Sequence, residues 1–232
     1  MYYEISAEKL KDRIKVLKAA QKDAIKNVDN LHVKLQRGNK KTGRNCYTVS
    51  LMAIVDCNNC KKCKYGCYDD NHDQIYPAVI ADRAKNSAIH KKDRARYWKE
   101  IDEQIKKLKV KELRLNVGGD LQYDDFKYVR VLGLENPDTD ILFFTKNYKG
   151  LNEYLDEVSF PENVHPIMSA WIGMKMDNRH NLPCSHVLFD DGKTTAPDYG
   201  AYYCKGNCSE CHIQGEGCWN LKKGEHVIFR AH

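Results

Sequence analysis

Strands and helices are predicted to alternate along the second half of this chain, and no other feature of the sequence limits its fold as strongly. Short apolar runs rich in β-branched and aromatic residues predict five strands, at 111–117, 140–147, 165–172, 185–190 and 226–232. Amphipathic stretches at 123–134 and 150–158 predict helices between the first three. Because strands joined through helices pair in parallel by right-handed crossovers, we expect an α/β fold, a partial or small (β/α) barrel with mostly parallel strands.

The first half of the chain adds helices and one strand. An amphipathic helix is predicted at 6–28, near the N-terminus. The apolar run at 46–55 predicts a strand, and 77–108 predicts a helix that is broken once. We therefore divide the chain into a basic N-terminal helix and loop, residues 1–45, and a single α/β domain, residues 46–232, which ends in a cysteine-rich tail.

The ten cysteines of the chain are expected to serve metal binding rather than disulfide formation. The N-terminus lacks the apolar segment of a secretory signal, and no apolar run approaches the ~20 residues of a membrane span. We therefore expect a cytoplasmic protein without a membrane partner. Thiols stay reduced in that compartment, so disulfides are disfavoured there.

Four of these cysteines lie within the twelve residues DCNNCKKCKYGC, at 56–67. Their C-x2-C-x2-C-x3-C spacing is that of bacterial ferredoxin ligands. Short spacers let several thiolates converge on the iron corners of one [4Fe-4S] cluster, and the interleaved lysines offset its negative charge. The sequence predicts a first cluster with the ligands Cys57, Cys60, Cys63 and Cys67.

A second cysteine group lies near the C-terminus and predicts a second cluster, with the ligands Cys204, Cys208, Cys211 and Cys218. Zinc is the alternative for both groups, because paired C-x2-C knuckles also hold a tetrahedral zinc ion. The crowding of the first group favours a cluster over a single ion. Cys46 and Cys184 stand alone, and we expect buried small hydrophobes there, although either could replace Cys67 or Cys218 as a ligand.

Candidate substrate and cofactor residues follow two of the predicted strands. In parallel sheets, ligands bind at the carboxyl ends of the strands. Gly118 and Gly119 would let the backbone approach a cofactor closely, and Asp120 could bind an amine or a ribose hydroxyl; the alternative is a tight turn with a capping aspartate. Lys146 ends the next strand and could neutralise an anionic ligand or remain solvated. Asp120 and Lys146 are the candidate catalytic residues.

Charge is spread unevenly along the chain. The net charge is +6, and residues 1–45 hold twelve Lys and Arg against five Asp and Glu. This basic N-terminal arm could contact nucleic acid, although a solvated helix face explains the same pattern. Three acidic residues after the first cysteine group are expected in a solvated loop: Asp69, Asp70 and Asp73.

From the first cysteine group to Lys146, the chain resembles a bacteriophage family called gene product 88. The shared features are a cysteine cluster that ends in Cys67-Tyr68, a helix, a strand of the form L-R-L-x-x-x-G-D at 113–120, and an aromatic strand that ends in Thr145-Lys146. The similarity covers about 100 residues and the cysteine-rich tail. It implies a phage protein in the host-cell cytoplasm and brings no settled activity with it.

A more distant resemblance is to radical S-adenosylmethionine proteins. Their order of strand, cysteine loop, helix and strand ending in Gly-Gly-Glu is similar to 46–55, 57–67, 77–108 and a strand ending in Gly-Gly-Asp here. The resemblance implies S-adenosylmethionine as a cosubstrate whose amino group meets Asp120. The first cysteine loop lacks that family's C-x3-C-x2-C spacing, which occurs instead in the C-terminal group.

These predictions together describe a cytoplasmic, phage-type iron–sulfur protein with two [4Fe-4S] clusters. We expect a redox or radical-type enzyme that acts on a small molecule or exchanges electrons with a redox partner. Two alternatives stay open: a zinc-stabilised regulatory module that binds nucleic acid, and a simple electron carrier.

Overall fold

The computed structural model describes residues 4–40, 42–57, 62–197 and 201–230. Seven strands of this part of the chain form one open sheet, in the order β1-β2-β3-β4-β5-β7-β6, and every neighbouring pair is parallel. The strands are β1 (Cys46–Val49), β2 (Glu112–Leu115), β3 (Asp140–Thr145), β4 (Val164–Ser169), β5 (Cys184–Leu188), β6 (Ala201–Tyr203) and β7 (His226–Arg230).

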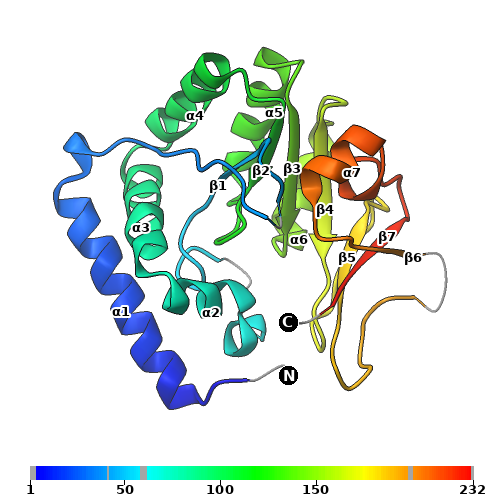
Figure 1. The fold of residues 1–232 in the computed structure, drawn as a ribbon, viewed down its shortest axis with the longest axis horizontal. Helices are drawn as coiled ribbons and strands as arrows, with labels where there is room; N and C mark the ends of the chain where they lie inside the picture. The colour runs from blue at the N-terminus through cyan, green and yellow to red at the C-terminus, as the bar shows by residue number, and fades with distance from the viewer. Residues whose placement is uncertain (1–3, 41, 58–61, 198–200, 231–232) are drawn as a thin grey trace.

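Seven α-helices and three short 3-10 helices accompany the sheet in the described residues (Figure 1). The α-helices are α1 (Ala7–Lys26), α2 (Tyr68–Ile75), α3 (Pro77–Lys92), α4 (Arg94–Leu108), α5 (Asp125–Glu135), α6 (Tyr148–Glu157) and α7 (Cys208–Gln214). The 3-10 helices are η1 (Val28–Asn30), η2 (Cys63–Gly66) and η3 (Gly217–Trp219). The predicted break within 77–108 is confirmed at Asp93, whose carboxylate accepts the Arg96 N–H and begins α4.

The two faces of the sheet bury different clusters. Side chains alternate along a strand, so Leu113 and Leu115 of β2 lie in the main core with residues of α4, α5 and α6. Leu142 of β3 and Ile167 of β4 lie on the other face, in a smaller cluster with Cys46, Cys211 and Trp219. We call this other side the second face; α7 and η3 cover it, and Figure 1 shows α7 beside β3 and β4.

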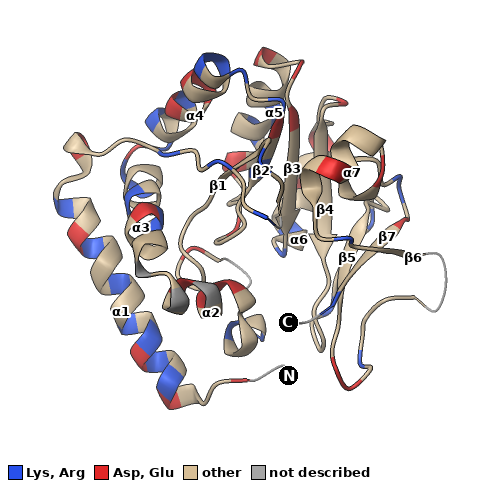
Figure 2. Cartoon of the chain, viewed as in Figure 1, with Lys and Arg blue, Asp and Glu red and all other residues tan. Residues whose placement is uncertain are grey.

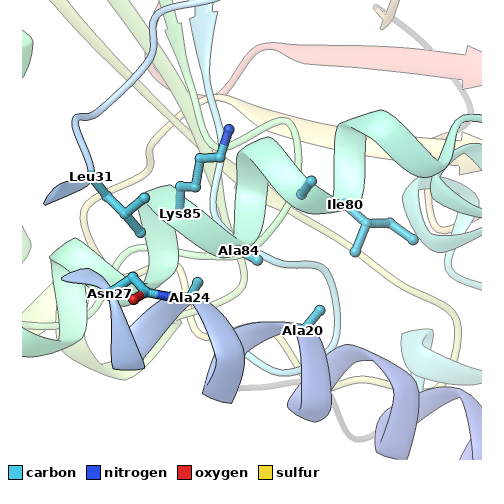
Figure 3. A pocket seen from close by; sticks show the side chains of 8 residues that line it. Ala20, Ala24, Asn27, Leu31, Ile80, Ala84 and Lys85 are labelled. Carbon is cyan, nitrogen blue, oxygen red and sulfur yellow. The ribbon is translucent and has the colours of Figure 1, made fainter.

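The N-terminal helix α1 packs along α3, as Figure 1 shows. Leu10 and Leu17 of α1 form a third buried cluster with Ala84 of α3 and with residues 52–54, which follow β1. A cavity of about 380 Å³ remains between the two helices, and its wall includes Ala20 and Ala24 (Figure 3). The amphipathic helix predicted at 6–28 is thus confirmed, and its apolar face contacts the rest of the protein.

The predicted α/β class and the parallel pairing of the strands are confirmed, and the sheet is open rather than a closed barrel. The order β1 to β5 follows the chain, as expected when each strand is laid beside the previous one. Among the described helices, none is both long and apolar enough to cross a membrane.

Candidate functional site

The first cysteine group lies at the carboxyl edge of the sheet. Cys57, Cys63 and Cys67 are described, and Cys60 lies outside the described residues. The Asp120 N–H, just beyond β2, donates to the Asp56 carbonyl at 3.1 Å, which fixes the chain one residue before Cys57. Burial raises the pKa of the Cys67 thiol, and the nearby Asp69, Cys57 and Cys63 raise it further. The three described thiols are therefore close enough to influence one another electrostatically.

Helix α1 is hydrogen-bonded to Asp56, the residue at which this cysteine loop begins. Gln21 donates from Nε2 to Asp56 Oδ1 at 3.0 Å and also to the Ser87 hydroxyl. Lys91 Nζ donates to Gln21 Oε1 at 2.7 Å, so both ends of the Gln21 amide are used. The other oxygen of Asp56 accepts the Met52 N–H at 2.9 Å. A buried polar network thus joins α1 and α3 to the residue that precedes the first cysteine.

The N-terminal segment also holds the exit of the loop. The Ile5 N–H donates to the Tyr65 carbonyl at 2.8 Å, and Arg13 Nε donates to Asp70 Oδ1 at 2.7 Å. Arg13 and Asp70 are both largely buried, so their ion pair is shielded from solvent. The segment predicted as a basic arm therefore contacts both sides of the first cysteine group.

The solvated loop predicted for Asp69, Asp70 and Asp73 is wrong. All three carboxylates are at least 95% buried, and all three residues belong to α2. Arg83 of α3 makes a bidentate contact with Asp69, with one of its bonds at 2.8 Å, and lies 2.8 Å from Asp73. Burial raises the pKa of Asp73 to about 6, although Arg83 opposes the rise. The arginine partners are distant in sequence, which local spacing does not reveal.

Gly118 and Gly119 do allow a close approach, and the groups that approach belong to this chain. A Cβ on Gly118 would lie 2.2 Å from Asp69 Oδ2. A Cβ on Gly119 would lie 2.6 Å from the Leu51 Cβ, and Gly119 also has a φ of +77°, which favours glycine. The paired glycines therefore let the end of β2 pack beneath α2 and beside the segment after β1.

Asp120 connects the ends of β2 and β3. Its carboxylate accepts the Thr145 hydroxyl at 2.6 Å, the Leu121 N–H at 2.8 Å and the Lys146 N–H at 2.9 Å. Burial raises the pKa of Asp120 to about 6, and these hydrogen bonds oppose the rise. Asp120 thus lies at the carboxyl edge of the sheet with three protein donors on its two oxygens.

Lys146 lies between Asp120 and the first cysteine group. Its ammonium is 5.6 Å from the centroid of the Trp171 ring. Burial alone lowers the pKa of Lys146, but the nearby Cys63 and Asp120 outweigh burial and leave that pKa raised. The structure therefore brings both candidate catalytic residues, Asp120 and Lys146, together with the first thiols.

The second cysteine group lies on the second face, around Arg114 of β2. Arg114 Nη1 contacts Cys208 Sγ at 3.9 Å, and its guanidinium lies 4.9 Å from the Phe144 ring centroid. Burial lowers the pKa of Arg114, but negative charge on Cys208 and other neighbours outweighs burial and raises it. The four predicted ligands also influence one another, so they form one neighbourhood: Cys204, Cys208, Cys211 and Cys218.

The two lone cysteines separate onto different faces of the sheet. Cys46 is fully buried on the second face and shares a side-chain hydrogen bond with Cys208, which raises the pKa of Cys46 and lowers that of Cys208. Cys184 lies in the main core, where the Asn178 amide donates to its sulfur at 3.1 Å. Only the first of the two therefore joins a predicted cysteine group.

Polar contacts at the amino ends of the strands hold α7 against the second face. The ring of His212 bonds from Nε2 to Asp140 Oδ2 at 2.7 Å, and the Ser209 hydroxyl donates to Glu112 Oε2 at 2.7 Å. His165 bonds to the other Asp140 oxygen at 3.0 Å, and this bond contributes most to lowering the pKa of Asp140. The helix that carries Cys208 and Cys211 is thus fixed to β2 and β3.

Two polar residues, one in β2 and one just after it, were not among the candidate site residues expected from the sequence. Arg114 Nε and Asn116 Nδ2 are buried and have no hydrogen-bond partner within the described part of the chain. Asn116 also has a φ of +51°, which is uncommon for a residue other than glycine. The alternation of polar and apolar residues in Glu112–Leu115 was the available signal, because it marks a polar second face.

The described residues contain no group of three or more His, Cys, Asp or Glu side chains that could hold a metal ion. Against the effect of burial, two predicted ligands of each group raise the pKa of a nearby cation: Cys208 and Cys218 act on Arg114, and Cys63 and Cys57 act on Lys146. A second cavity, of about 350 Å³, reaches the C-terminal group, and its wall includes His165, His180 and Cys218.

Both signs of charge lie along α1, as Figure 2 shows. Lys15 pairs with Asp12 at 2.9 Å and Lys26 with Asp23 at 2.8 Å, and all four side chains are exposed. Exposed pairs of this kind contribute little to stability.

Comparison with known proteins places the chain in a family. The sequence profile described as Gene product 88 matches residues 16–182, which include the first cysteine group, Gly118 to Asp120 and Lys146. The match extends further toward the N-terminus than expected and ends before the C-terminal cysteine group. Searches of curated proteins and of solved structures found no match, so the relation to radical S-adenosylmethionine proteins stays a prediction. The chain belongs to the Gene product 88 family of phage proteins.

Proposed function

We propose that this protein holds two [4Fe-4S] clusters, one at the carboxyl edge of the parallel sheet and one on its second face, and that it performs redox or radical-type chemistry on a small substrate. One observation carries the proposal: a cationic side chain lies near thiols of each cysteine group. Lys146 is the cation of the first group, and Arg114 is the cation of the second.

The electrostatic argument begins with the charge of the donor set. Four thiolates around an iron–sulfur core leave a net negative charge, and a buried charge is costly unless an opposite charge is near. The Arg114 guanidinium contacts Cys208 directly at 3.9 Å, and Cys218 is among the groups that raise its pKa. Such a cation stabilises thiolate ligands in a partly apolar site.

The spacing of the cysteines along the sequence is compatible with a cluster. A cubane is larger than a single ion, so its ligands stand farther apart than the ligands of one zinc ion. Cys57, Cys63 and Cys67 would supply three ligands of the first cluster, and Cys60 would supply the fourth.

The substrate would bind at the carboxyl edge of the sheet, next to the first cysteine group. When bound, the clusters would supply the electrons, and the chain would bind and orient the substrate. Lys146 carries a positive charge beside Trp171, which suits an anionic or polarised substrate group. Asp120 fixes the backbone of Lys146 through the bond to its N–H at 2.9 Å.

Anaerobic purification tests this proposal. We expect a brown protein with broad absorption near ~400 nm and roughly eight irons per chain, as two cubane clusters require. Electron paramagnetic resonance of the reduced protein, recorded with and without S-adenosylmethionine, then tests whether this cosubstrate binds, because its binding to an iron that lacks a cysteine ligand changes the spectrum. A colourless protein that holds zinc alone would contradict the proposal.

A simple electron carrier is the second candidate, and the state of Asp120 favours it. Both Asp120 oxygens already accept protein donors, which leaves this carboxylate little capacity for a substrate. A carrier would be reduced and reoxidised by a small redox protein at a rate that an Asp120→Asn substitution leaves unchanged. An enzyme would lose substrate turnover in the same variant.

A further inference from the structure

The cavity of about 350 Å³ that reaches the C-terminal segment is lined by β4 and by the segments before and after it. We propose that this cavity binds a small neutral molecule of the phenol class, with an apolar ring and a hydroxyl group that donates to a histidine. The inference goes beyond the proposed function, because the wall of this cavity contains neither Asp120 nor Lys146 and the binding does not require iron.

Most of the cavity wall is apolar. Three prolines, three leucines, Val164, Ile167 and Phe160 form this part of it. The volume is roughly twice the ~150 Å³ that holds a benzene molecule in an apolar protein cavity, and it is within the usual range of small-molecule sites. Phe160 can also pair edge-to-face with an aromatic ligand. The wall therefore suits a ligand with one apolar ring.

Two histidines supply hydrogen-bond acceptors to this wall. Nε2 of His165 lies 3.0 Å from Asp140 Oδ1. Nε2 of His180 lies 3.0 Å from Asp156 Oδ1 and 3.1 Å from the Asn152 carbonyl oxygen. Carboxylate and carbonyl oxygens only accept hydrogen bonds, so both rings carry a proton on Nε2. In the neutral ring Nδ1 is then an acceptor, which a ligand hydroxyl can use.

The remaining charges of the wall favour a neutral ligand. Glu162 and Lys223 line the same cavity, are exposed and have opposite charges, so neither a cation nor an anion meets a surface of one sign. The side chains of His165 and His180 are 22% and 25% exposed, which gives a ligand access from solvent. An apolar ring with one hydroxyl donor therefore matches the wall better than a charged molecule.

Isothermal titration calorimetry of the full chain tests this inference with three probes: p-cresol, toluene and 4-methylanisole. The measurement is made at pH 8.5, where an ordinary imidazole is neutral. Toluene lacks the hydroxyl group, and 4-methylanisole keeps the oxygen but cannot donate. We expect p-cresol to bind about fivefold more tightly than either of the other two, as one additional hydrogen bond supplies.

Two variants locate the binding. Leu221→Trp puts a larger side chain into the cavity and should weaken p-cresol binding by at least about tenfold, because overpacking opposes entry of the ligand. Ala24→Leu, which enlarges a side chain in the other cavity, between α1 and α3, is the matched control and should leave the affinity unchanged. The double variant His165→Phe/His180→Phe keeps an apolar wall without the acceptors, so it should bind p-cresol and toluene equally.

Three results would overturn the inference: no binding of p-cresol to the wild type, equal affinities of the wild type for p-cresol and 4-methylanisole, or p-cresol binding that Leu221→Trp leaves unchanged. If Leu221→Trp does not fold, the histidine variant decides, because a preference for p-cresol that persists there would also refute the assignment. A wild type that lacks iron and still prefers p-cresol would contradict the proposed function and leave this inference standing.

Discussion

The two cysteine groups are supported by different kinds of interaction. The first group lies in a loop at the carboxyl edge of the sheet, and buried ion pairs hold it, with Arg83 and Arg13 on the carboxylates of α2. The second group lies on a face of the sheet, in an apolar cluster with Leu142 and Trp219. Buried ion pairs thus lie beside the first group, whereas the second group lies among apolar side chains, with polar contacts from α7 to Glu112 and Asp140 at the amino ends of β2 and β3.

This difference predicts how each region responds to change. Charge pairing is sensitive to pH and to the loss of one partner, because the other charge is then buried alone. Hydrophobic packing is sensitive to lost volume and largely indifferent to pH. Four predictions test this contrast, from the largest expected effect to the smallest.

The largest effect is expected from Arg83→Met, which leaves the carboxylates of Asp69 and Asp73 buried without their cation. The free energy of unfolding should fall by about 3–5 kcal/mol, as for other broken buried pairs. Denaturant unfolding measures the change. Lys15→Ala, which removes an exposed ion pair, is the control and should cost less than about 1 kcal/mol. Equal losses of unfolding free energy in the two variants would show that the buried ion pairs do not stabilise the fold.

The matching change in the second region is Leu142→Ala, which opens a cavity in the apolar cluster. Leu142 is 0% exposed, so the loss should be about 3 kcal/mol. The destabilisation should be the same at pH 5 and pH 7, since it removes no charge. Ile213→Ala, at a side chain of α7 that is 75% exposed, should change little. A strong pH dependence of the Leu142 effect would contradict the contrast.

The pH dependence of the first region should appear at Asp73. Its folded pKa of about 6 is higher than the model-peptide value of 3.8, so the folded state binds the proton more tightly. This carboxyl therefore makes the protein less stable as pH rises from about 4 to 6. In Asp73→Asn that decline should be weaker, by on the order of 2 kcal/mol across the window. Unfolding curves at pH 4, 5, 6 and 7 measure it; parallel profiles of variant and wild type would refute the assignment.

The smallest effect is expected from Gln21→Ala, which removes the bridge between α1 and Asp56 at 3.0 Å. Stability should fall by about 1–2 kcal/mol, because Asp56 loses a buried donor. In protein prepared without iron, alkylation of Cys57 and Cys63, followed by peptide mass spectrometry, should become faster, while that of Cys211 stays constant. Lys22→Ala, the exposed neighbour on α1, is the control. A uniform rise at all cysteines would indicate global loosening rather than release of the first loop.

The sequence predicts the sheet better than it predicts the ion pairs that hold the site in place. Apolar runs locate β2 and β3 and the alternation with α5 implies parallel pairing, because these signals are local and periodic. The partners of Asp69 and Asp70 come from α3 and α1, so no local pattern could distinguish a buried helix from a solvated loop. Short β6 has only three residues and gives too weak a periodic signal.

The same limit applies to the cysteines. Spacing alone identified the two groups, and the structure gathers the described members of each. Spacing could not tell Cys46 from Cys184, because their roles depend on which face of the sheet each side chain occupies. That choice follows from strand register, which only the assembled sheet reveals.

The iron content of single cysteine variants tests the central claim most directly. The wild type, Cys63→Ser and Cys211→Ser, each purified anaerobically, should hold roughly eight, four and four irons per chain, because each substitution removes a ligand from a different cluster. The wild type should be brown, and each variant should keep one set of cluster signals. A wild type with zinc and no iron, or variants that keep all their iron, would contradict two separate iron–sulfur sites.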